Sequence, residues 1–261
     1  MIVYGVNPVL EALRAGRVSR VRIGPKGLAR LHAASAGRVE AVLPAMSPRL
    51  AEVARLARDS GVALDIVDHA EIERAAQGGV HQGVVADVTG RDESWTPASL
   101  AAAAEGPALI VVLDGIEDPH NVGAILRSAD AAGADGVIRQ TRHAARLDGA
   151  AAKASAGAVA HVRVASVVNV ARALEELKDA GVWTIGLAGE AGESYDEVDL
   201  TLPTALVIGA EGTGLRRLVR ERADRLVRIP MHGRVSSLNA SVAASVVLFE
   251  ARRQRRRATR R

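Results

Sequence analysis

Three segments of the chain combine the end of an apolar run with polar side chains or glycines: residues 113–127, 208–214 and 229–239. Ligands of open parallel sheets bind outside the carboxyl ends of the strands. If the three apolar runs are strands of one such sheet, these segments meet at one edge. They are therefore candidates for a single ligand site.

The first segment predicts a strand, a turn and a helix that Asn121 caps and Gly133 ends. The buried stripe of this helix is formed by Val122, Ile125, Leu126 and Ala129. Arg127 lies well off that stripe, roughly above Gly123, and a glycine there lets another group approach the helix near the guanidinium. The alternative is a capped helix with a solvated arginine.

The second segment has the spacing G-x-x-G-x-G, formed by Gly209, Gly212 and Gly214. No Lys-Ser or Lys-Thr follows the last glycine, so it is not a Walker A loop, and the spacing is not that of a dinucleotide-binding loop. Glycines let a backbone wrap closely around a flat ligand. A glycine-rich connection without a ligand is the alternative.

The third segment begins with Ile229-Pro230-Met231 at the end of a strand. Ser236 and Ser237 are predicted to cap a long helix, rich in small residues that let another helix come close. The serines and Asn239 are alternatively plain caps and early-turn polar residues.

The remaining pattern predicts two α/β parts joined by a linker. Residues 1–90 predict a small domain, with helices from Asn7-Pro8, from Ser47-Pro48 and over 70–76, and strands at 21–23, 62–67 and 83–88. Residues 91–106 predict a linker with a loose helix after Pro97. Residues 107–261 predict a parallel sheet with helices on both faces, because apolar runs recur at 108–113, 182–187, 205–208 and 226–229.

The composition narrows the class of protein. Apolar residues make up 48% of the chain and aromatic residues 2%, so globular cores must be filled by Ala, Val, Leu and Ile. The sequence has no cysteine, which excludes disulfides, cysteine nucleophiles and thiolate metal sites. Neither a signal sequence nor an apolar run of membrane-spanning length is recognisable, so we expect a cytoplasmic protein.

Basic residues are concentrated in two places. No acid lies between Glu11 and Glu40, and the tail 251–261 contains seven arginines and no acid. Such clusters bind phosphate backbones through counterion release. A solvated surface with a frayed tail is the alternative. We predict that RNA contacts the cluster formed by Arg14, Arg17, Arg20, Arg22, Lys26 and Arg30, which extends to Arg38.

In order and spacing, the three segments together resemble the SpoU (TrmH-like) RNA 2′-O-methyltransferases. The matching stretches are 118–123 with Arg127, 208–212, and 229–231 with 237–239. Residues 4–9 and 81–83 resemble the N-terminal substrate-binding domain of that family. The resemblance implies an α/β fold: a C-terminal parallel-sheet SPOUT domain with a deep trefoil knot, an exception to the rule against knots, and a small ribosomal-protein-like domain.

The resemblance also implies a cofactor, a partner and a substrate. S-adenosylmethionine is the expected cofactor, no metal is needed, and the expected assembly is a homodimer through the C-terminal helix. The subgroup most similar methylates a guanosine in the peptidyl-transferase region of 23S rRNA. Asp148-Gly149 departs from the family's pattern, which affects contacts to the target loop. The expected cofactor contacts are Ala188, Gly189, Gly209, Ile229, Met231 and Leu238.

By family analogy, Arg127 activates the ribose 2′-oxygen that attacks the methyl group. Because arginine effectively never deprotonates, we expect Arg127 to bind the adjacent phosphate bidentately and to stabilise the developing alkoxide. Asn121, Ser237 and Asn239 are expected to position Arg127 and the ribose. Glu211 is expected to pair with Arg127 or to hold the turn.

Several alternatives stay open at this point. A non-catalytic RNA-binding protein explains the basic clusters but not the three polar strand ends. A tRNA methyltransferase, or an antibiotic-resistance enzyme acting on another rRNA nucleotide, shares the motifs. A nicotinamide-dependent enzyme lacks its fingerprint. The sequence fixes neither the target nucleotide nor whether the substrate is free rRNA or an assembling subunit.

Overall fold

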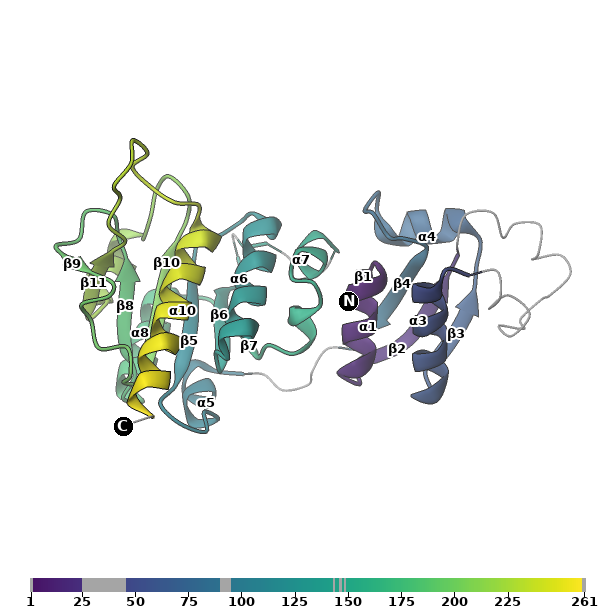
Figure 1. Cartoon of the computed structure of the whole chain (residues 1–261), viewed down its shortest axis with the longest axis horizontal. Coiled ribbons are helices and arrows are strands. Elements are labelled where there is room, and N and C mark those ends of the chain that lie inside the picture. Colours follow the sequence, from purple (N-terminus) through teal and green to yellow (C-terminus); the bar gives the residue numbers. More distant parts are fainter. Residues whose placement is uncertain are drawn as a thin grey trace, which may run out of the picture. The chain divides into compact units, whose positions relative to one another are not determined.

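The computed structural model describes residues 2–24, 46–89, 95–142, 144–145, 147 and 149–259. The chain forms two compact units: Met1–Asp92 with Arg146–His161, and Glu93–Ala145 with Val162–Arg261 (Figure 1). The segment 146–161 thus groups with the first unit, whereas the sequence placed it within 107–261. The described part of the predicted linker groups with the second unit.

The first unit contains a four-stranded sheet with the order β1-β4-β2-β3. β2 pairs with β3 in parallel, and the other two pairs are antiparallel. Helix α1 packs against α3 and β4, and α4 packs against β1 and β4. The elements are β1 (Ile2–Tyr4), α1 (Val6–Arg14), β2 (Val18–Ile23), α3 (Pro48–Asp59), β3 (Ala63–Ile66), α4 (His69–Ala76) and β4 (Val84–Val88).

Helix starts in this unit follow the sequence in one case and depart from it in another. Ser47 caps α3 as predicted. Helix α1, however, begins at Val6 after Gly5, whose φ of 92° is left-handed, and not at Asn7. The backbone N–H of Val6 donates to Oε1 of Gln82 at 3.0 Å. A side chain far along the chain therefore bonds to the first N–H of the helix, and Asn7 lies inside the helix.

A later segment completes the first unit. Helix α7 (Gly149–Ala154) packs on β1, and the 3-10 helix Ala158–Ala160 packs on α1. Arg17 Nη1 donates to the carbonyl oxygens of Val159 and Ala160 at 3.1 and 3.0 Å. These contacts explain why residues far along the chain belong to the N-terminal unit.

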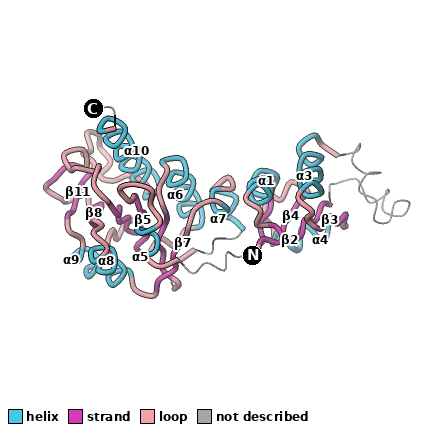
Figure 2. Tube along the Cα trace, turned by 90° about the horizontal axis from the view of Figure 1, so that it is seen from below, coloured by secondary structure: helices cyan, strands magenta, loops and turns pink. Residues whose placement is uncertain are grey.

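The second unit is a seven-stranded, entirely parallel sheet with the order β7-β6-β5-β10-β8-β11-β9. Helices α6 and α10 pack together on one face, and α5, α8 and α9 lie on the other (Figure 2). The predicted α/β class is confirmed. The elements are α5 (Pro97–Ala102), β5 (Leu109–Asp114), α6 (Pro119–Ala132), β6 (Gly136–Gln140), β7 (Val164–Val167), α8 (Val170–Asp179), β8 (Trp183–Leu187), β9 (Glu193–Ser194), β10 (Thr204–Gly209), α9 (Arg217–Arg222), β11 (Arg225–Arg228) and α10 (Ala240–Ala258).

The core of this unit fixes where the strands end. Ile110 and Val112 of β5 are fully buried against Leu174 and Leu177 of α8. β5 and β10 pair in register over their whole length, from Leu109↔Thr204 to Asp114↔Gly209. The two loops that follow these strands therefore leave the sheet at the same edge.

The basic tail is part of a helix in the described residues, so the interpretation of a frayed tail is wrong. Helix α10 continues to Ala258. Arg255 is half-buried, and its guanidinium donates to the carbonyl oxygens of Leu200, Ala108 and Leu202, each at 2.9 Å. Burial lowers the pKa of Arg255. No described helix has the length and apolar character needed to cross a membrane.

Candidate active site

A pocket of about 680 Å³ opens where β8, β10 and β11 end. This volume lies within the usual range for small-molecule sites. The pocket is formed by residues 187–190, the loop after β10 and the segment from 227 to the first turns of α10. All six predicted cofactor contacts line it: Ala188, Gly189, Gly209, Ile229, Met231 and Leu238.

Three predicted catalytic residues also line this pocket: Glu211, Ser237 and Asn239. Asn239 Nδ2 donates to Glu211 Oε1 at 2.5 Å and to Asn121 Oδ1 at 2.9 Å. Asn121 Nδ2 donates to the same Glu211 oxygen at 3.2 Å. This network joins the three segments that the sequence had singled out.

The helix caps beside the network differ from the prediction. Asp118 caps α6 by accepting from the His120 N–H at 2.9 Å, and Asn121 lies buried inside the helix. Pro119 at the first helical position fits this start. Asn239, and neither serine, caps α10 by accepting from the N–H of Ser241. Asn121 is thereby free to bond across to another loop.

Arg127 lies apart from this network. Its side chain is exposed on α6, it does not line the pocket, and it makes no hydrogen bond or ion pair with the residues that the structure describes. Its predicted pairing with Glu211 is not formed. Within the described part of the chain, no donor of this guanidinium is taken up by another residue.

Charged residues that the sequence did not single out also line the pocket: Glu190, Arg220 and Arg228. Glu190 forms an ion pair with Arg220. A backbone hydrogen bond and the contact with Arg220 lower the pKa of the Glu190 carboxyl. Arg228 Nη1 donates to the carbonyl oxygen of Ala191 at 2.6 Å. Arg220 and Arg228 belong to the charged stretch 216–228, whose place beside the pocket is visible only in the structure, and Glu190 lies outside that stretch.

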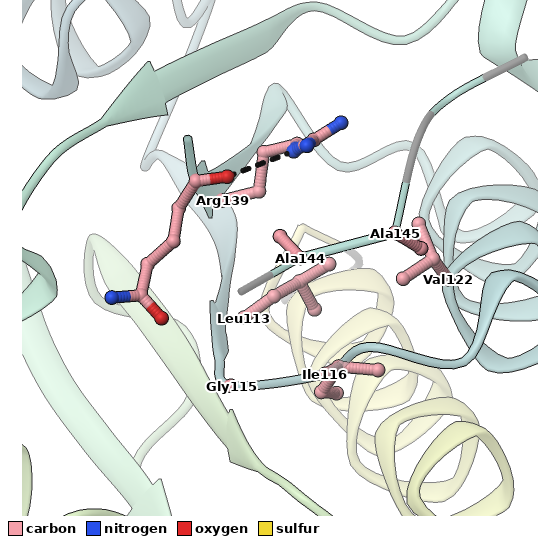
Figure 3. A pocket seen from close by; sticks show the side chains of 8 residues that line it. Leu113, Gly115, Ile116, Val122, Arg139, Ala144 and Ala145 are labelled. Carbon is pink, nitrogen blue, oxygen red and sulfur yellow. Dashed lines mark hydrogen bonds between the residues drawn. The ribbon is translucent and has the colours of Figure 1, made fainter. Parts of the chain in front are cut away.

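Residues that pack around a small gap support the loop between β5 and α6 (Figure 3). Leu113, Ile116 and Val122 face Ala144 and Ala145 across it. Arg139 also lines this gap, and its Nε donates to the backbone oxygen of Gln140 at 3.2 Å. This packing holds the turn that precedes Asn121.

The four described arginines of the predicted RNA-binding cluster all have partners within the first unit. Arg14 bonds to Glu11 and Glu52, and Arg20 to Asp65. Arg22 is mostly buried and bonds to both carboxylate oxygens of Asp87 at 3.0 and 3.1 Å. Arg17 bonds to carbonyl groups. Lys26, Arg30 and Arg38 lie outside the described residues.

His69, Glu73 and His81 form the one group of three potential metal ligands among the described residues. The Gly24 carbonyl, 2.7 Å from His69 Nδ1, requires a proton on that nitrogen. His81 Nδ1 accepts from the Gly83 N–H at 3.0 Å, so its proton lies on Nε2, 3.2 Å from Glu73. A metal on His81 Nε2 would displace that proton, so this hydrogen-bond pattern does not suit His81 as a metal ligand.

Comparison with known proteins gives consistent matches over both units. Residues 108–249 match the SpoU rRNA Methylase family, and residues 2–93 match the RNA 2′-O ribose methyltransferase substrate binding family. The 23S rRNA (guanosine-2′-O-)-methyltransferase RlmB of Pseudomonas syringae pv. tomato is 48% identical over 211 residues, which are 80% of this chain and 84% of that protein. RlmB of Pseudomonas aeruginosa is 43% identical over 256 residues, 97% of this chain and 96% of that protein.

A solved structure resembles the whole chain as well. The SpoU methyltransferase AviRb from Streptomyces viridochromogenes, in complex with the cofactor AdoMet, superposes with a TM-score of 0.75 at 28% identity. The match covers 98% of this chain and 91% of that one.

Proposed function

The chain belongs to the SpoU rRNA methylase family, and we propose that it transfers a methyl group from S-adenosylmethionine to the ribose 2′-hydroxyl of a guanosine in 23S rRNA. The observation that carries this proposal is the joining of the three motif segments around one pocket, through Asn121, Glu211 and Asn239. An rRNA substrate would be met in the cytoplasm.

The pocket suits S-adenosylmethionine. Gly209 brings backbone close to backbone, since a methyl group added there would lie 2.3 Å from the carbonyl carbon of Gly214. The lining combines small residues with aliphatic side chains, and its charged groups are Glu190, Glu211, Arg220 and Arg228. When bound, the cofactor supplies an electrophilic methyl group. The pocket residues orient it and exclude water.

We assign substrate activation to Arg127. A guanidinium with no partner in the described chain can bind an RNA phosphate through two parallel hydrogen bonds. The same charge stabilises the oxyanion that forms as the 2′-hydroxyl loses its proton, and the phosphate accepts that proton. Glu211 and the two asparagines hold the loops around the ribose, and Ser237 offers it a further hydrogen bond.

We assign RNA binding to basic residues of the first unit. Lys26 and Arg30 are proposed phosphate contacts. Arg14 and Arg20 are half-exposed in their ion pairs and can exchange a carboxylate for a phosphate. Arg22 is mostly buried and bidentate on Asp87, and Arg17 holds carbonyl groups, so both contribute chiefly to the fold of the unit.

We also propose that the protein is a homodimer through α10. Val242 and Phe249 are seven residues apart on one face of this helix, and 47% and 51% of their surfaces are exposed. A second copy would bury this apolar face. Phe249→Asp should convert a dimer to a monomer in analytical ultracentrifugation, and a monomeric wild-type protein would contradict the proposal. The deep trefoil knot stays a prediction.

The test of function is to map 2′-O-methylation in rRNA from cells with and without the protein. One guanosine of 23S rRNA should lose its methyl group without the protein and regain it on complementation. Calorimetry should detect S-adenosylhomocysteine binding and no NAD binding. A lost methyl group in tRNA alone, or no lost methyl group, would overturn the assignment.

A further inference from the structure

Asp114 is the only fully buried carboxylate among the residues that the structure describes. It is the last residue of β5, and both its oxygens bond to Arg216. Oδ2 accepts from the backbone N–H of Arg216 at 2.8 Å, and Oδ1 accepts from Nε at 2.6 Å and contacts Nη2. A buried charge persists only where such bonds compensate for lost water.

The pair closes the loop that follows β10. Gly209 lies beside Asp114 in the sheet, and the chain then turns tightly. Ala210 N–H donates to the Gly214 carbonyl at 3.1 Å, and Gly214 N–H donates to the Ala210 carbonyl at 2.9 Å. Two residues later, Arg216 returns to Asp114. Both ends of the loop 209–216 are therefore fixed at one point on the sheet edge.

Everything between those fixed ends lines the pocket. Residues 209–215 form its wall, and Glu211 within the loop accepts from Asn121 and Asn239. Asp114 and Arg216 themselves do not line the pocket. Any effect on the cofactor must therefore act through the position of the loop.

We propose that the Asp114–Arg216 pair is a positioning device that holds the loop 209–216 in its cofactor-binding conformation and so sets the affinity for S-adenosylmethionine. This inference rests on the proposed function. Asp114→Asn keeps the shape of the side chain but removes the charge and one acceptor, so an amide N–H faces the donors of Arg216. The loop 209–216 should then be displaced where it lines the cofactor pocket.

Asp224 provides a matched control. It also bonds to both a backbone and a side chain, accepting from Thr184 N–H at 2.8 Å and Thr184 Oγ1 at 2.6 Å, and it pairs with Lys178. Thr184 lies near the start of β8, whereas the pocket lies where β8 ends. Asp224→Asn therefore disturbs the same sheet without touching the loop.

The experiment measures S-adenosylhomocysteine affinity by calorimetry and the melting temperature of each variant, with kcat and KM for S-adenosylmethionine on rRNA. Asp114→Asn should raise the dissociation constant about 10- to 100-fold, the loss expected when one or two hydrogen bonds between the loop and the cofactor are misaligned. KM should rise more than kcat falls. Asp224→Asn should stay within about twofold of the wild-type affinity even where it lowers the melting temperature.

Arg216→Lys decides the case if Asp114→Asn does not fold. It keeps the backbone N–H and the charge but lacks the fork, and it should weaken binding about tenfold. Wild-type affinity in a folded variant of the pair, or an equal loss in Asp224→Asn, would refute the positioning role. A wild-type protein that binds no S-adenosylhomocysteine would instead refute the proposed function.

Discussion

Replacing Arg127 with alanine separates an enzyme from an RNA-binding protein. Arg127 is exposed and has no partner among the described residues, so the folded state loses little. The free energy of unfolding should change by at most about 0.5 kcal/mol, which corresponds to a shift in melting temperature of roughly 2 °C or less. The rate should respond far more strongly. Removing a comparable oxyanion donor lowers turnover about 100- to 1,000-fold, or about 2.7–4 kcal/mol.

The assay follows methyl transfer to a 23S rRNA transcript, together with S-adenosylhomocysteine affinity and melting temperature. Affinity should hold, because Arg127 does not line the pocket. Arg127→Lys should restore little of the rate, since a point charge cannot replace a bidentate fork. A folded Arg127→Ala protein with a near wild-type rate would refute the catalytic role. A variant that fails to fold would refute the claim that Arg127 contributes little to the stability of the fold.

Three further predictions concern stability. Arg22→Ala should lower the free energy of unfolding by about 1.5–3 kcal/mol in urea titrations, because it removes two hydrogen bonds to Asp87 from a mostly buried site, whereas Arg20→Ala, at an exposed pair, should not. Asn121→Ala removes the hydrogen bonds of a buried side chain to the exposed Glu211 and Asn239 and should lower the free energy of unfolding by about 0.5–1.5 kcal/mol, and an unchanged melting temperature would contradict the network. Burial acts to raise the pKa of Asp224, but hydrogen bonds hold it below its ordinary value of 3.8. Its contribution to stability is therefore present above about pH 4 and is lost as the pH falls through the lowered pKa, so Asp224→Asn should flatten the acid side of the stability curve.

Local sequence patterns, such as capping residues and apolar runs, predicted most helices and strands. Ser47 before Pro48 predicted the start of α3, and Gly133 predicted the end of α6. The apolar run before Asp114 predicted a buried strand. Each of these signals depends on residues within a few positions of one another, as capping and buried-strand patterns do. The start of α6 also has a local signal, since a capping aspartate, Asp118, precedes Pro119 at the first helical position.

The sequence by itself thus determined two α/β parts, a parallel sheet and the three polar segments at its strand ends. Only the tertiary structure decided which side chains meet. Asn121 and Asn239 are 118 residues apart, and Asp114 and Arg216 are 102 apart. The first bond exists because α6 packs against α10, and the second because β5 lies beside β10; no local propensity encodes either neighbourhood. Likewise, the Gln82 side chain accepts from the first N–H of α1, and Asp87 accepts from Arg22, which the sequence had assigned to RNA. Buried polar groups form hydrogen bonds with the partners that lie next to them in the folded chain.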